Sequence, residues 1–179
     1  VGVITEPKER GEQQVVRAKC VLSNADIQRT LESMVGVEHL PKRWITKMEN
    51  FEMADAIFAT FLGVKKDLAA AGMRATNYWQ FDTYDFEELY APRFEGTTLE
   101  TKGCFITSST IKDPEFASHH APPGVTNVEV MTIVPGAAKH WHVDQNAIQN
   151  WDYKSSSDYQ ALKSNIEEQM VNRLEGLFP

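Results

Sequence analysis

The sequence lacks the features that mark several classes of protein. With 2 cysteines in 179 residues it cannot form a disulfide-rich scaffold, and Cys20 and Cys104 are expected to be free thiols. No apolar stretch approaches the roughly 20 residues that cross a bilayer. The formal net charge of -7 disfavours binding to nucleic acid or to an anionic membrane surface. We therefore expect a globular protein of a reducing compartment, placed in the cytoplasm.

The glycines lack the spacing of a nucleotide-binding loop. None of the 10 glycines stands two residues from another, so the sequence has no G-x-G element. The backbone needs such glycines at the start of a helix to approach a pyrophosphate closely. We expect no FAD to bind to this chain by itself.

The apolar content of 42% is enough for a core, and its patterning predicts both strands and helices. A hairpin is expected over residues 1–24, with a charged turn at residues 6–12 that holds Pro7. Further strands are expected at residues 53–64, 76–81, 103–109 and 125–134, and helices after Asp26, from Pro41, after Asp85 and from Ser157. The predicted fold class is α+β: a mixed, mostly antiparallel sheet of about five or six strands with helices packed on one face.

Two of these segments carry unusual apolar patterns. Residues 53–64 are apolar on both faces of the expected strand, which predicts that protein or a ligand covers each face. The last helix is expected to begin with a capping box formed by Ser157 and Gln160. Its apolar residues share one stripe, which we expect to pack on the sheet: Tyr159, Leu162, Ile166, Met170, Leu174 and Leu177.

Three groups of reactive side chains are better explained without catalysis. His140, His142 and Asp144 would share one face of a strand but supply at most three metal ligands, so no metal is expected. Cys104 lacks the surroundings of a nucleophile and is expected in the core. The acidic run of Asp82, Asp85, Glu87 and Glu88 could hold an acid and base pair, but the solvated face of a short helix is the more common arrangement.

Several stretches, taken in order along the chain, resemble one family. The strand at residues 16–22 leads into Ser23-Asn24-Ala25-Asp26, and Ala75-Thr76-Asn77-Tyr78-Trp79 follows. Residues 105–114 end in Lys112-Asp113-Pro114, Ala121-Pro122-Pro123-Gly124 comes next, and residues 159–179 close the set. Together they are similar to the FAD-dependent phytoene dehydrogenase-like oxidoreductases, which include the retinol saturases.

This resemblance implies an excised middle piece of such an enzyme. Residues 1–25 would be a hairpin and strand on the parent's flavin-domain side, and residues 26–179 its substrate-binding domain. Ser23, Asn24 and Ala25 match a place where the family's chain runs beside the cofactor. The implied partner is the missing flavin-binding domain of the same polypeptide, with FAD bound only in the full-length parent, and the fragment alone inactive. Peripheral membrane contact of the parent stays open.

The resemblance further implies an oxidoreductase that removes or adds hydrogen across carbon–carbon bonds of an apolar, isoprenoid (carotenoid- or retinoid-like) substrate. No catalytic residue is assigned. Candidates for the substrate pocket are Ile57, Phe61, Tyr78, Trp79 and Phe81, and plain core packing of these side chains is the alternative. Two other functions stay open: a stand-alone module that binds a lipophilic ligand without catalysis, and a segment of an amine-oxidase-like flavoenzyme.

Overall fold

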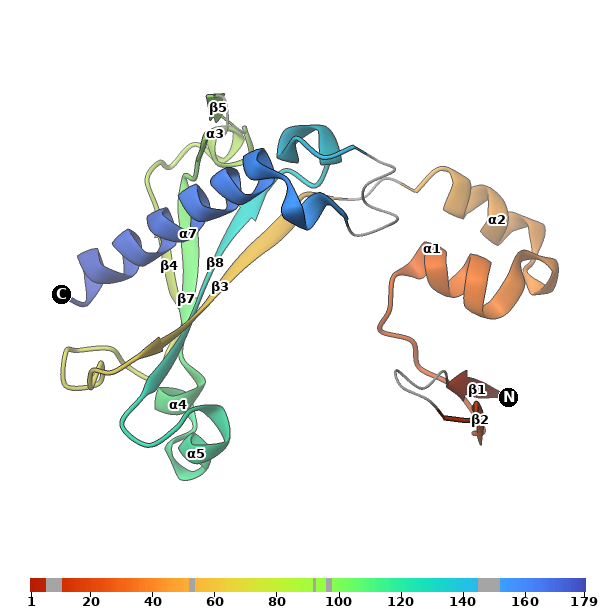
Figure 1. Cartoon of the computed structure of the whole chain (residues 1–179), viewed down its shortest axis with the longest axis horizontal. Coiled ribbons are helices and arrows are strands. Elements are labelled where there is room, and N and C mark those ends of the chain that lie inside the picture. Colours follow the sequence, from red (N-terminus) through yellow and green to blue (C-terminus); the bar gives the residue numbers. More distant parts are fainter. Residues whose placement is uncertain (6–10, 52–53, 92, 96–97, 145–151) are drawn as a thin grey trace. The chain divides into compact units, whose positions relative to one another are not determined.

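A computed structural model describes residues 1–5, 11–51, 54–91, 93–95, 98–144 and 152–179 (Figure 1). The chain divides into two compact units, Val1–Glu52 and Met53–Pro179. The functional boundary expected between residues 25 and 26 falls inside the first unit and stays a prediction. Met53 and the turn residue Pro7 lie outside the described residues.

The first unit holds the expected hairpin and two helical segments. Strands β1 (Gly2–Thr5) and β2 (Gln14–Arg17) pair antiparallel, and β2 ends before residue 22, where the expected strand ends. The first helical segment joins α1 (Ile27–Arg29), the π-helical η1 (Thr30–Gly36) and the 3-10 turn η2 (Val37–His39), and α2 (Lys42–Glu49) follows. The Asp26 side chain caps α1 by accepting a hydrogen bond from the Arg29 amide at 2.7 Å. Met48 is the one buried hydrophobic residue among those described here.

The second unit is built on a four-stranded antiparallel sheet. Its strands are β3 (Ala56–Val64), β4 (Tyr78–Phe81), β7 (Gly103–Thr107) and β8 (Thr126–Val134), in the order β3-β8-β7-β4. The predicted α+β class with a mostly antiparallel sheet is confirmed. The sheet has fewer strands than the expected five or six, because β1 and β2 pair only with each other and β5 (Arg93–Glu95) pairs only with β6 (Thr98–Glu100).

Helix α7 (Ser157–Leu177) lies along one face of this sheet (Figure 1). Four residues of the predicted stripe are buried in the core, and they are Leu162, Ile166, Met170 and Leu174. Ile106, Val128 and Val130 belong to the same buried cluster. The predicted capping box is wrong by one residue: Ser156 is the N-cap, and its hydroxyl accepts from the Tyr159 amide at 3.5 Å. Ser156 has the extended backbone that this position needs.

Polar side chains of α7 bind the backbone beside β6. The Gln169 amide oxygen accepts from the Thr101 amide at 3.0 Å, and its nitrogen donates to the Leu99 carbonyl at 2.7 Å. The Leu99 amide in turn donates to the Asn165 side chain at 3.2 Å. These side chains satisfy backbone groups that a neighbouring strand would otherwise pair.

Short elements complete the second unit. Helix α3 (Phe86–Tyr90) begins at its expected cap, Asp85, whose side chain accepts from the Glu87 amide at 2.9 Å. The others are α4 (Ser109–Lys112), η3 (Pro114–Phe116), α5 (Ala117–His120), η4 (Ala138–Trp141) and η5 (Asp152–Ser155). Among the described helices, none combines the length and the apolar character that crossing a membrane requires.

Candidate functional site: an apolar pocket on the open sheet face

The two faces of the sheet differ in what covers them. Along β7, Cys104 and Ile106 are buried toward α7, while Phe105 between them points to the opposite face. We call this second surface the open face. The open face extends across all four strands, because paired residues point to the same side of a sheet. Met131 pairs with both Ala59 and Phe105, and Phe105 also pairs with Trp79.

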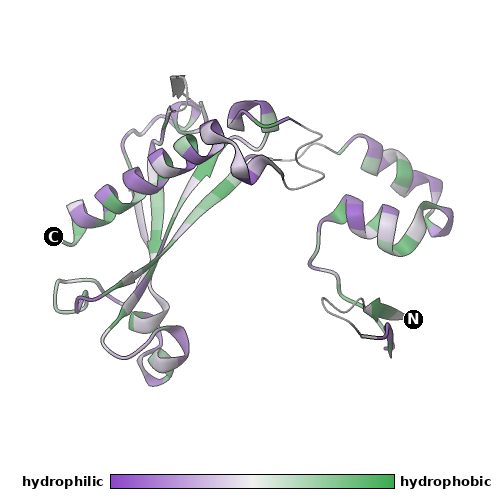
Figure 2. Cartoon of the chain, viewed as in Figure 1, coloured by the Kyte–Doolittle hydropathy of each residue, from purple (hydrophilic) through white to green (hydrophobic). Residues whose placement is uncertain are grey.

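Large apolar side chains on the open face stay exposed. The exposed fractions are 68% for Ile57, 73% for Phe61 and 66% for Trp79. Figure 2 shows hydrophobic segments along the strands of this sheet. A contiguous group of exposed apolar residues is a common mark of a binding surface. Residues 53–64 were expected to be covered on both faces, whereas β3 is covered on one.

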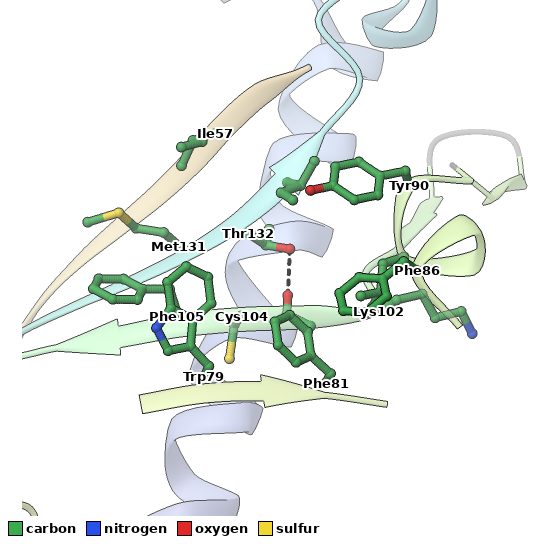
Figure 3. Close-up of a pocket in the computed structure, with 13 residues that line it drawn as sticks. Ile57, Trp79, Phe81, Phe86, Tyr90, Lys102, Cys104, Phe105, Met131 and Thr132 are labelled. Carbon is green, nitrogen blue, oxygen red and sulfur yellow. Dashed lines mark hydrogen bonds between the residues drawn. The ribbon is translucent and has the colours of Figure 1, made fainter. Parts of the chain in front are cut away.

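A pocket of about 430 Å³ lies on the open face. Helix α3 forms one wall through Phe86, Leu89 and Tyr90, and the strands form the floor (Figure 3). The strands contribute Ile57, Trp79, Phe81, Lys102 next to β7, Gly103, Cys104, Phe105, Met131, Thr132 and Ile133. Most of the lining is therefore apolar or aromatic.

The aromatic floor has a defined geometry. The Trp79 and Phe105 rings meet edge to face, with centroids 4.8 Å apart and an interplanar angle of 62°. Trp79 also lies 6.1 Å from Phe81, with the planes tilted by 30°. Such pairs hold each ring in place. The floor therefore presents apolar ring surface in a fixed arrangement.

Two polar lining residues make hydrogen bonds or ion pairs. Thr132 donates a hydrogen bond from its hydroxyl to the Gly103 carbonyl at 2.7 Å. The Lys102 ammonium lies 2.5 Å from a Glu100 carboxylate oxygen and 3.8 Å from one of Glu88. No histidine, serine or carboxylate is among the lining residues that the structure describes. The apolar lining is suited to binding an apolar ligand.

Cys104 does not supply a reactive thiol to the pocket. Its side chain is buried, as predicted, and its sulfur lies 3.7 Å from the Gln80 side-chain oxygen. Burial raises the pKa of the Cys104 thiol above its usual value, and the neighbouring Arg173 partly opposes this change. The thiol is therefore protonated at neutral pH, and only thiolates are good nucleophiles.

The sequence-predicted pocket residues fall into three groups. Ile57, Trp79 and Phe81 line the pocket. Phe61 lies on the open face but outside the lining, in register with Glu129. Tyr78 points to the covered face, where its ring lies 5.3 Å from that of Phe178.

Sequence reasoning missed the contributions of β7, β8 and α3. Phe105 and Met131 lie on strands that were predicted, and their position between buried neighbours follows from strand alternation. Which strands lie side by side was not visible, because pairing depends on long-range register. Phe86 on α3 carried no signal beyond its apolar character.

The residues expected beside a cofactor lie in the first unit. Ser23, Asn24 and Ala25 are exposed, and the Ser23 hydroxyl lies 2.9 Å from that of Thr30 and accepts from the Ala25 amide at 3.3 Å. The glycines with positive φ in the described ranges are Gly36, Gly72 and Gly124, each far from the next in sequence. The described residues thus do not fit the pyrophosphate of FAD.

The histidine arrangement differs from the one expected. His140 lies on the 3-10 turn η4, and His142 has a left-handed backbone with φ of 54°. They do not alternate along a strand, as the assumed metal site required. Within the described ranges, no group of three or more His, Cys, Asp or Glu side chains could hold a metal ion.

The acidic run serves structure. The Asp82 carboxylate forms a two-pronged ion pair with Arg173, with nitrogen–oxygen distances of 2.9 and 2.5 Å. The hydrogen bond from Arg173 lowers the pKa of Asp82 below its ordinary value, against an opposing effect of burial. Asp85 caps α3, and Glu88 faces Lys102. No two of these carboxylates are placed as an acid and base pair in the pocket.

Comparisons of the chain with protein-family models, with curated proteins and with solved structures find no match. The functional conclusion therefore depends on the geometry of the pocket.

Proposed function

We propose that this chain is the substrate-side part of an FAD-dependent oxidoreductase that adds or removes hydrogen across carbon–carbon bonds of an apolar, isoprenoid substrate. One observation carries the proposal. The sheet is covered on one face by α7, and its other face holds an apolar, aromatic pocket of about 430 Å³. The substrate lies in this pocket.

The pocket has the properties of a small-molecule site. Its volume is within the roughly 300–1,000 Å³ of typical ligand pockets. The fold does not need the open face for its core, because α7 and the covered face already supply one. Side chains such as Trp79 and Phe105 gain about 25 cal/mol for each Å² of apolar surface that a ligand removes from water.

The described lining contains no histidine or carboxylate, which agrees with chemistry carried by a cofactor. A flavin supplies hydride transfer when it is bound. The residues of this chain bind the apolar substrate, orient it against the aromatic floor and exclude water. The described residues do not fit the flavin's pyrophosphate, so in this proposal the parent's flavin-binding domain holds the FAD. FAD titrated into this chain alone is expected to show no binding by flavin fluorescence.

A stand-alone binding module for a lipophilic ligand is the second candidate. The same pocket favours it, because an apolar lining is sufficient for binding. Turnover separates the two functions. The full-length protein with flavin should change an isoprenoid substrate by one hydrogen pair, seen by mass spectrometry, whereas a binding module should leave the ligand unchanged. No observation specifically favours the amine-oxidase-like alternative.

The pocket itself is tested with a neutral apolar fluorophore, N-phenyl-1-naphthylamine. Its fluorescence should rise on binding to the chain. Trp79→Ala should weaken the affinity roughly tenfold, since an aromatic contact contributes about 0.5–1.5 kcal/mol. Trp44→Ala is the matched control, because Trp44 is also exposed but lies in the first unit. Equal affinities of the two variants would contradict the assignment of the pocket.

A further inference from the structure

The pocket contains one charged lining residue among those described, and its charge is directed away from the cavity. Lys102 precedes β7, and its side chain is 13% exposed. Figure 3 shows its nitrogen at the far end of the side chain from Trp79 and Phe105, and Phe86 lines the same pocket. The stem thus contributes apolar surface, and the ammonium does not face the ligand space.

Two carboxylates that are not part of the pocket lining pair with the Lys102 ammonium. Glu100 on β6 lies 2.5 Å from it and Glu88 on α3 lies 3.8 Å from it, each distance being measured from Nζ to Oε1. The Lys102 ammonium therefore faces two carboxylates. A third carboxylate, brought by a ligand, would have to compete with both for the same ammonium.

We propose that Lys102, Glu88 and Glu100 form a charge filter that selects uncharged apolar molecules over apolar carboxylates. This inference rests on the proposed function, because it concerns the ligand of the same pocket. A carboxylate that enters an apolar pocket loses hydration and needs a partner in return. Lys102 is the only cation in the described lining, and its charge is already compensated. An uncharged head group does not need that partner.

The filter is tested by competition against bound N-phenyl-1-naphthylamine at pH 8. The competitors are 1-decanol and decanoate, which share an alkyl chain and differ in charge. Decanol should displace the probe at a concentration about tenfold or more below that of decanoate. The hydration of the free ligands adds to this ratio, so the decisive quantity is the change in the ratio between protein variants.

Glu100→Gln removes the closer carboxylate and should let Lys102 reach the ligand. Decanoate affinity should then rise about tenfold, and decanol affinity should stay within twofold, which also shows that the pocket has folded. Glu167→Gln is the matched control, because it makes the same charge change on α7, where Glu167 pairs with Lys163. In the double variant Glu100→Gln/Lys102→Met, the gain for decanoate should disappear.

The outcomes separate the two proposals. An unchanged decanol-to-decanoate ratio in Glu100→Gln, or a gain that survives Lys102→Met, overturns the charge filter and leaves the apolar pocket standing. Failure of the probe and decanol to bind the unaltered chain overturns both proposals.

Discussion

Helix α7 joins the sheet through a few fully buried side chains, and Ile166→Ala tests how much the fold depends on them. Ile166 is 0% exposed and belongs to the cluster that contains Ile106 and Val130. The substitution removes three buried carbons, which costs roughly 2.4 kcal/mol at about 0.8 kcal/mol each. The cavity left behind adds about 1 kcal/mol. We expect the free energy of unfolding to fall by about 3–4 kcal/mol.

Thermal unfolding followed by circular dichroism measures this loss. For a chain of this size, each kcal/mol lowers the midpoint by about 2–4 °C, so the expected decrease is about 6–16 °C. Ile57→Ala is the matched control, because it removes the same atoms from a residue that is 68% exposed on the open face. Its effect should stay within about 0.5 kcal/mol. Equal midpoints for the two variants would refute the packing of α7 on the sheet.

Three further predictions concern single side chains. Asp82→Asn should lower the urea midpoint at neutral pH, because it removes the ion pair with Arg173. The pKa of Asp82 is lowered on folding, so the ion pair stabilises the protein above the ordinary pKa of 3.8, and this stabilisation is lost as the pH falls through the lowered pKa. The difference in midpoint from the unaltered protein should therefore vanish in strong acid. Thr60→Val should stabilise the protein by about 1 kcal/mol in urea unfolding, since the buried Thr60 hydroxyl has no hydrogen-bond partner among the described atoms. A loss of stability would show that this hydroxyl has a hydrogen-bond partner. Iodoacetamide should modify Cys20 in the folded protein and Cys104 only after denaturation, because Cys104 is 3% exposed and its pKa is raised. Equal labelling of the two cysteines in the folded protein, measured by mass spectrometry, would contradict this prediction.

Local patterns in the sequence predicted much of the fold. The stripe of α7 was visible because an α-helix places residues three and four apart on one side. The cap Asp85 was visible, and Asp26 was one of three candidates with Ser23 and Asn24, because short polar side chains bond the first free amides of a helix. The cap of α7 was missed by one position, since three consecutive serines, residues 155–157, offer the same chemistry.

The pocket was only partly predictable. Tyr78, Trp79 and Phe81 were predicted together as pocket residues because all three are aromatic. Tyr78 and Trp79 are neighbours on one strand, however, so their side chains must point to opposite sides of the sheet. The alternation of side chains contained that information, and the prediction did not apply it. Phe105 and Met131 reach the site through the pairing of β7 with β8, which depends on residues far apart in sequence. The 3-10 turn at His140 likewise lacked a clear sequence signal.

The register of the four-stranded sheet also bears on how this protein can change during evolution. In all four strands the odd-numbered side chains point to the open face and the even-numbered side chains to the covered face. Trp79, Phe105 and Met131 show the first direction, and Tyr78, Ile106 and Val130 show the second. Point substitutions at odd positions can therefore change the open face while the core is inherited unchanged. A single-residue insertion or deletion inside a strand exchanges the two sets beyond that point. Divergence of this sheet should proceed by substitution, with length changes confined to the connecting loops.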